Sequence, residues 1–251
     1  MDNNTSKNRI FFVEGCKGGV GKSLMCSVLM DSLLESKSKV LLIESDTTNP
    51  ELWSTYKDTG TPVHPLDLDD PQGWIALVNI AEQHPDYHVV VNTAARNLKG
   101  TSSFGYTLYD SLEELGRSLV TYFVINHEVE SVHLLKAYWH SLPPEAMENI
   151  SLHVVRNHFF STDYSLFDKS KIRGEIERNG GALLNLPVLA RDVAEFLRNQ
   201  KIPIGTAMQP GHMAMGNRAV LRRWRSVVRQ EIERSLAPRW SSSDEVRAIS
   251  A

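Results

Sequence analysis

Two lysines flank a glycine-rich turn near the start of the chain, and this arrangement can bind a polyphosphate. The run is Lys17-Gly18-Gly19-Val20-Gly21-Lys22-Ser23, followed by Leu24. In such a phosphate-binding loop, backbone N–H groups surround the phosphates, one lysine (Lys22) reaches the β- and γ-phosphates, and a hydroxyl (Ser23) ligates Mg²⁺. The sequence therefore predicts a nucleoside triphosphate site with Lys17 as an additional cation.

The general form of this loop requires glycine at the position of Cys16. The early lysine and the variable residue before it resemble instead the deviant phosphate loop of the ParA/MinD family of ATPases. The resemblance implies that Lys17 reaches the nucleotide of a partner subunit, so that ATP is sandwiched in a homodimer. It also implies catalytic roles for Lys17, Lys22 and Asp46, because cations beside the phosphates and an oriented water favour γ-phosphoryl transfer.

Polar residues follow the next two strand-like runs, where parallel strands place their ligands. Asp46 matches the family aspartate that orients the attacking water near Mg²⁺, while Glu44 replaces a shorter acid. Asn92 stands where the family has an aspartate that holds a metal-bound water. Because an amide supplies no negative charge, we expect weak Mg²⁺ binding and slow hydrolysis. Each of these two residues also has a purely structural alternative to its functional role. Asp46 would simply belong to a polar turn after a strand, and Asn92 would simply cap the turn that follows it.

Two later positions complete the predicted nucleotide site. Asn157 follows another strand-like run, and its amide can pair with the donor and acceptor of adenine. Pro187 lies in a segment that resembles the family loop packed over the base. The resemblance extends from Ile10 to about Ile204.

The elements around these residues predict a doubly wound, mostly parallel α/β sheet with helices on both faces. Nearly continuous apolar runs are typical of strands covered on both sides. The predicted strands are Ile10 to Val13, Val40 to Ile43, His88 to Val91, Val120 to Ile125, Leu152 to Val155 and Ala182 to Leu186. The predicted helices run from Leu24 to Leu34, from Pro71 to Ala81, from Ile172 to Arg178 and from Asn217 to Leu236. We expect a flexible N-terminus over 1–8, a single P-loop ATPase domain over 9–236 and a disordered tail over 237–251.

Composition favours a cytoplasmic bacterial protein. The 251 residues carry a formal net charge of −3, so any nucleic-acid contact must come from a local patch. Two cysteines, Cys16 and Cys26, make neither a disulfide framework nor the iron–sulfur ligands of nitrogenase-type relatives. The nine histidines lack the spacing of a metal site. The polar N-terminus lacks a signal-peptide core, and no apolar stretch is long enough to span a membrane.

The last predicted helix combines an apolar face with a basic stripe. Its arginines are spaced to stack along one side: Arg218, Arg222, Arg225 and Arg229. We predict non-specific DNA binding here and hence association with the nucleoid. A solvated surface and, less favoured, a membrane-binding face are the alternatives.

Together these features predict an ATP-dependent dimerisation switch for DNA partition, positioning or conjugal transfer. The cofactors are ATP and Mg²⁺, and a partner protein of unknown identity stimulates hydrolysis. The departures at Glu44 and Asn92 resemble ATPases of plasmid stability and conjugal transfer. A nucleotide-loaded adaptor with little hydrolysis and an ATP-dependent ligase or synthetase of the same superfamily are alternatives.

Overall fold

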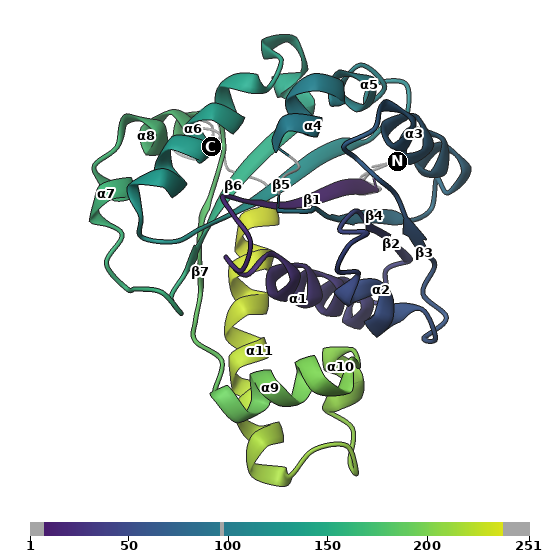
Figure 1. Cartoon of the computed structure of the whole chain (residues 1–251), viewed down its shortest axis with the longest axis vertical. Helices are drawn as coiled ribbons and strands as arrows, with labels where there is room; N and C mark the ends of the chain where they lie inside the picture. Colours follow the sequence, from purple (N-terminus) through teal and green to yellow (C-terminus); the bar gives the residue numbers. More distant parts are fainter. Residues whose placement is uncertain (1–7, 96–97, 238–251) are drawn as a thin grey trace, which may run out of the picture.

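A computed structural model describes residues 8–95 and 98–237. Its centre is a seven-stranded sheet in which every strand pair is parallel (Figure 1). The strand order is β3-β2-β4-β1-β5-β6-β7. The strands are β1 (Arg9–Gly15), β2 (Val40–Glu44), β3 (Val63–Pro65), β4 (His88–Asn92), β5 (Ser118–Ile125), β6 (Ile150–Asn157) and β7 (Leu183–Leu186).

Helices cover both faces of this sheet, with α1, α2 and α9 to α11 on one side and α3 to α8 on the other (Figure 1). The longer helices are α1 (Lys22–Glu35), α3 (Pro71–Gln83), α6 (Val129–Ser141), α8 (Lys171–Arg178), α9 (Arg191–Gln200) and α11 (Met215–Leu236). The shorter ones are α2 (Glu51–Tyr56), α4 (Leu98–Phe104), α5 (Tyr106–Tyr109), the 3₁₀ helix η1 (Pro144–Asn149), α7 (Ser165–Asp168) and α10 (Ile204–Ala207).

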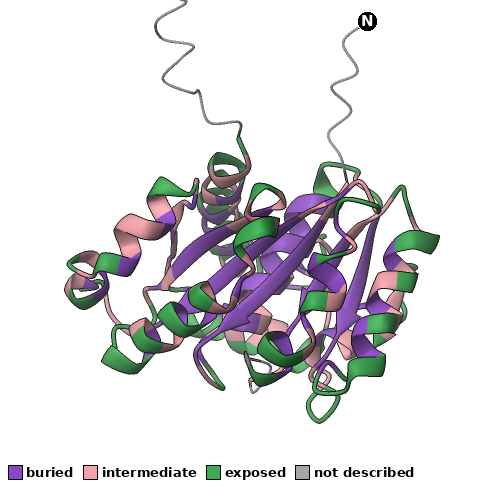
Figure 2. Ribbon diagram, turned by 90° about the horizontal axis from the view of Figure 1, so that it is seen from above, coloured by how far each residue is buried: buried purple, intermediate pink, exposed green. Residues whose placement is uncertain are grey.

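The core lies between the sheet and its two helical layers. The strands are buried along most of their length, while the helices expose their outer surfaces (Figure 2). Phe11, Phe12 and Phe123 on the central strands are at most 1% exposed. The doubly wound α/β prediction is therefore confirmed, because burial on both faces explains why these strands contain little but apolar residues.

All six predicted strands and all four predicted helices are present, with ends shifted by a few residues. Strand β3 was not predicted because it has three residues, ends in Pro65 and lies at the sheet edge, where burial imposes little pattern. The short helices α2, α4, α5, α7 and α10 and the longer α6 and α9 were also not predicted. The predicted flexible N-terminus and disordered tail fall mostly outside the described residues.

Candidate functional site

The phosphate-binding loop joins the end of β1 to the start of α1, at the carboxyl edge of the sheet. Gly19 and Gly21 have φ angles of 74° and 107°, a left-handed conformation that side chains disfavour. Glycine adopts this conformation without strain. The turn directly precedes α1, whose N-terminus carries partial positive charge. Local structure therefore matches the loop that the sequence predicts.

Lys22 is the buried cation of this loop. The residue is 8% exposed, and its Nζ donates a hydrogen bond to the carbonyl of Lys17 at 3.2 Å. Burial lowers the pKa of Lys22, while the negative charge of Glu14 acts in the opposite direction. An anion beside this amine would relieve the cost of burying its charge.

A cavity of about 390 Å³ opens beside the loop. Its lining includes seven of the predicted site residues, namely Gly18, Gly19, Gly21, Lys22, Ser23, Leu24 and Asp46. The remaining predicted nucleotide-site residues, Lys17, Val20, Asn92, Asn157 and Pro187, are described but do not line it. The phosphate and metal parts of the predicted site therefore meet in one space.

Asp46 lies on this cavity in the turn after β2. Its Oδ1 accepts hydrogen bonds from the Thr48 hydroxyl at 2.9 Å and from the Asn49 N–H at 3.0 Å. These bonds orient the carboxylate. A fixed carboxylate opposite a phosphate-binding loop can position a water or a hydrated Mg²⁺.

Glu44 and Asn92 form a buried pair beneath that turn. The Glu44 carboxylate accepts hydrogen bonds from the N–H groups of Asp46, Leu52 and Trp53 and from Asn92 Nδ2, the last at 2.8 Å. Burial raises the pKa of Glu44 to about 7, although these four donors favour the charged form. The acid therefore ties the start of α2 to β4.

Asn92 retains one free acceptor. Its Oδ1 is buried and has no hydrogen-bond partner among the described residues. A water bound to Mg²⁺ is a donor that satisfies such an oxygen. The residues therefore fit the predicted metal, with Ser23 and Asp46 on the cavity and Asn92 behind them.

Lys17 points to a neighbouring element rather than into the cavity. Its ammonium pairs with the carboxylate of Glu128, at the N-terminus of α6. The side chains are 40% and 46% exposed. This pairing was not predicted, because Glu128 is 111 positions away in the sequence.

Asn157 and Pro187 have contacts that differ from the predicted ones. Asn157 Nδ2 donates to the carbonyl of Val20 at 2.8 Å, and its Oδ1 accepts from the Phe159 N–H at 3.1 Å. Asn157 thus supports the phosphate-binding loop. The carbonyl of Pro187 accepts from the Trp224 indole at 2.8 Å, which connects this segment to α11. Reading of adenine by Asn157 stays a prediction.

Sequence reasoning missed a buried acid and most of one wall of the cavity. Glu14, 1% exposed, accepts hydrogen bonds from the Thr93 and Thr101 hydroxyls beneath the loop. An acid within an otherwise apolar strand was the available signal. This wall comes from the segment after β7. Leu189 lies in the segment predicted to pack over the base, whereas Ala194, Leu197, Arg198, Ile202, Pro203 and Ile204 were not predicted. The wall is mainly apolar, which suits a nucleobase.

The four arginines of α11 differ in their surroundings. Arg225 and Arg229 pair with acids of α1, and Arg229 also pairs with Glu233. Arg218 donates to the carbonyl of Met213 at 2.7 Å, while Arg222 is exposed. Half of the predicted DNA-binding stripe is therefore neutralised within the chain, which the sequence did not predict.

The residues in 8–95 and 98–237 show neither a cluster of metal-binding side chains nor a membrane-spanning helix. No group of three His, Cys, Asp or Glu side chains there is placed to hold a metal ion. None of the helices in these ranges combines the length and apolarity needed to cross a bilayer.

Comparison with known sequences identifies a similar protein but no matching family model. The chain is 42% identical over 226 residues to the protein MobD of Acidithiobacillus ferrooxidans, covering 89% of this chain and 96% of that protein.

Similar solved structures share its fold at low identity. The MinD cell division protein of Aquifex aeolicus aligns with a TM-score of 0.50 and 15% identity, over 86% of this chain and 96% of that one. A ParA family ATPase from Chlorobium tepidum aligns with a TM-score of 0.51 and 14% identity, over 87% and 98%. A protein described as a plasmid partition protein of Borrelia burgdorferi, with AMPPNP bound, aligns with a TM-score of 0.52 and 14% identity, over 91% and 100%.

Proposed function

This chain belongs to the family of the protein MobD and has the ParA/MinD fold, and from these premises we propose that it is an ATP-dependent dimerisation switch. ATP binding closes a homodimer, the dimer engages DNA, and slow hydrolysis releases it. A partner protein stimulates hydrolysis. Among the predicted settings, a relative named MobD favours mobilisation, the conjugal transfer of DNA.

The observation that supports this proposal most strongly is that the phosphate-binding loop and Asp46 line the same cavity. Backbone N–H groups of the loop and the Lys22 amine bind the β- and γ-phosphates. Ser23 and Asp46 would hold Mg²⁺, and the buried Asn92 Oδ1 would accept a hydrogen bond from a water on that ion. The ion, when bound, would supply positive charge beside the phosphates.

Asp46 is proposed to position the attacking water. The hydrogen bonds from Thr48 and Asn49 hold its carboxylate in one orientation, so that little reorganisation is needed. Asn92 gives the metal-bound water a neutral acceptor where the family has a carboxylate. We therefore expect slow turnover.

The adaptor with little hydrolysis is a second candidate, and the Glu44–Asn92 pair favours it. The Asn92 amide donates to Glu44, so this position serves the structure of the α2 turn as well as the metal. The two functions differ in one measurable quantity, the turnover of bound ATP. A ligase or synthetase stays an alternative that requires a second substrate.

The test separates nucleotide binding from dimerisation. Affinity for a fluorescent ATP analogue and molecular mass by light scattering are measured with ATP and Mg²⁺. Lys22→Ala should weaken ATP binding by more than about tenfold, because a buried phosphate contact is lost. Lys17→Ala should bind ATP like wild type but remain a monomer, since its contact lies in the partner subunit.

Asp46→Ala serves as the complementary variant. It should still bind ATP and dimerise, yet it should stay dimeric because the water is no longer positioned. Dimerisation of Lys17→Ala at the wild-type ATP concentration would show that the cross-subunit role is wrong. A wild-type protein that binds ATP as a permanent monomer would exclude the switch itself.

A further inference from the structure

Lys17 is the residue proposed to cross the dimer interface, and in the single chain it already has an ion-pair partner. Its ammonium pairs with Glu128, and this contact raises the pKa of Lys17 and lowers that of Glu128. Lys17 does not line the cavity. Its side chain contacts the N-terminus of α6 instead. A lysine bound in this way must exchange partners before it can reach a phosphate.

The turn that presents Glu128 is itself fixed to the loop. The Asn126 Oδ1 accepts from the Glu128 N–H at 3.1 Å, and the Ser131 hydroxyl accepts from the Asn126 N–H at 3.2 Å. Ser131 Oγ also contacts Asn126 Oδ1 and lies 2.8 Å from the Sγ of Cys16, the residue before Lys17. Cys16 and Lys17, two consecutive residues, thus both contact the turn formed by residues 126–131. These contacts hold the Glu128 carboxylate beside the Lys17 ammonium.

We propose that Glu128 is a positioning residue that holds Lys17 in the monomer and competes with the partner subunit's nucleotide for it. This inference rests on the proposed function. Forming the dimer breaks two Lys17–Glu128 pairs and makes two lysine–phosphate contacts. Glu128 therefore sets the ATP and protein concentrations at which the dimer forms.

The expected effect is modest because the pair is partly exposed. An ion pair at the surface contributes little because water screens it, and forming the dimer breaks two of them. Removing the carboxylate should therefore lower the dimer dissociation constant about 2- to 30-fold. Added salt screens the pair and should narrow the difference between variant and wild type.

The experiment compares Glu128→Gln with Glu130→Gln. Glu130 is an acid in the first turn of the same helix. Its charge also raises the pKa of Lys17, as the smallest of the causes, but it makes no hydrogen bond or ion pair to Lys17, so it controls for helix-dipole and net-charge effects. The dimer dissociation constant is measured by analytical ultracentrifugation in saturating ATP and Mg²⁺. ATP affinity is measured at protein concentrations that keep the chain monomeric.

Glu128→Gln should tighten the dimer and leave monomer ATP affinity unchanged, whereas Glu130→Gln should behave like wild type. Glu128→Asp retains the charge on a shorter side chain and should restore the wild-type constant in part. Equal dimer constants for Glu128→Gln and Glu130→Gln would overturn the proposal.

A measurement without nucleotide keeps the inference separate from the proposed function. Acetylation of the Lys17 amine by acetic anhydride is followed by mass spectrometry in the monomer. It should be faster in Glu128→Gln than in wild type or Glu130→Gln, because only the unprotonated amine attacks the anhydride and the Glu128 carboxylate favours the protonated form. Equal rates would show that Glu128 does not hold Lys17. Faster labelling without ATP-dependent dimerisation would instead reject the proposed switch.

Discussion

At the scale of single residues, the replacement of an acid by Asn92 has a structural reason as well as a functional one. The sequence predicted only a weaker metal site. In the structure the Asn92 amide donates to Glu44, an acid that is fully buried and whose pKa burial raises to about 7. An aspartate at position 92 would place a second carboxylate against Glu44.

Asn92→Asp should therefore destabilise the fold, and more at high pH than at low pH. Two buried carboxylates at this distance cannot both ionise without cost, so their folded pKa values rise above the unfolded ones. Such groups contribute stability below the unfolded pKa, and this stability is lost as pH rises through the folded pKa. We expect a loss of about 2–4 kcal/mol at pH 8 and a smaller loss at pH 5. Urea denaturation at both pH values measures it.

Asn199→Asp is the matched control, because Asn199 is exposed on α9. It should change the free energy of unfolding by less than about 0.5 kcal/mol at either pH. The same loss for both variants would contradict the role of the Glu44–Asn92 pair.

At the scale of elements, α11 is attached to α1 by charge. The Arg225 guanidinium, 16% exposed, pairs with Asp31, 5% exposed, and with Glu35. Burial raises the pKa of Asp31, while Arg225 acts to lower it. Asp31 and Glu35 lie in the C-terminal half of α1, so this pairing holds α11 against the end of α1 that is farther from the phosphate-binding loop.

Arg225→Ala should destabilise the fold by about 3–5 kcal/mol, because it leaves a buried aspartate without its cation. Arg222→Ala, three residues away on the exposed side, should cost no more than about 0.5 kcal/mol. Chemical denaturation of both variants provides the comparison. Similar midpoints would mean that the pair contributes nothing to stability.

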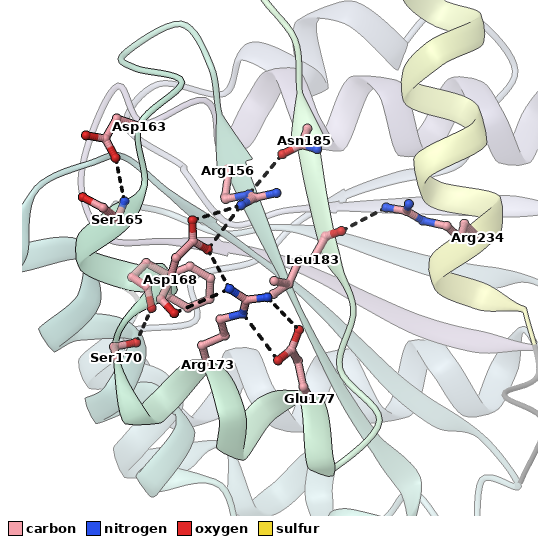
Figure 3. Close-up of polar contacts among 11 residues, drawn as sticks. Arg156, Asp163, Ser165, Asp168, Ser170, Arg173, Glu177, Leu183, Asn185 and Arg234 are labelled. Carbon is pink, nitrogen blue, oxygen red and sulfur yellow. Dashed lines mark hydrogen bonds and ion pairs between the residues drawn. The ribbon is translucent and has the colours of Figure 1, made fainter. Parts of the chain in front are cut away.

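A second set of polar contacts fixes the edge of the sheet. Glu231 of α11 accepts a hydrogen bond from the Asn185 N–H. Arg234 of the same helix donates a hydrogen bond to the Leu183 carbonyl (Figure 3). On the other side, Arg156 bridges Asn185 and Asp168 (Figure 3). Glu231 and Arg234 thus occupy backbone groups of edge strand β7 that would otherwise be free to pair with another strand, while Arg156 holds the Asn185 side chain.

Sequence patterns predicted the features formed by residues close together in the chain, but they did not predict contacts between residues far apart in it. Repeating apolar runs predicted the buried strands, and the glycine-rich run predicted a loop between β1 and α1, because both signals lie within a few residues. Partners of Lys17 and Arg225 lie 111 and 194 positions away. Only the fold brings them together, so their spacing in the sequence contains no trace of the ion pairs.

At the scale of the whole molecule, helix α11, which carries the exposed arginines, contacts α9, and α9 supplies part of the wall of the cavity beside the phosphate-binding loop. The N-terminal half of α11 projects with α9 and α10 from one end of the molecule (Figure 1). Arg222 and Arg223 are exposed there, whereas Arg225 and Arg229 pair with acids. Any DNA contact of this helix thus depends on its exposed arginines.

We expect the ATP-bound dimer, but not the monomer, to bind duplex DNA without sequence preference. A dimer carries two copies of the exposed arginines, and affinity for DNA grows steeply with the number of phosphates contacted. Replacing Arg222 and Arg223 by Ala should flatten the dependence of log affinity on log salt by about 2 for each subunit. Arg229→Ala should leave that slope unchanged, because its charge is already compensated by Glu35 and Glu233.

Gel shifts with ATP and with ADP, over a series of salt concentrations, measure these slopes. Parallel binding to anionic vesicles tests the membrane alternative on the same variants. DNA retention that is independent of nucleotide and unchanged in the Arg222/Arg223 double variant would contradict the prediction. In that outcome the buried side of α11, with Leu221, Trp224 and Val228, would serve only to pack the helix, and its arginines would serve only as a solvated surface.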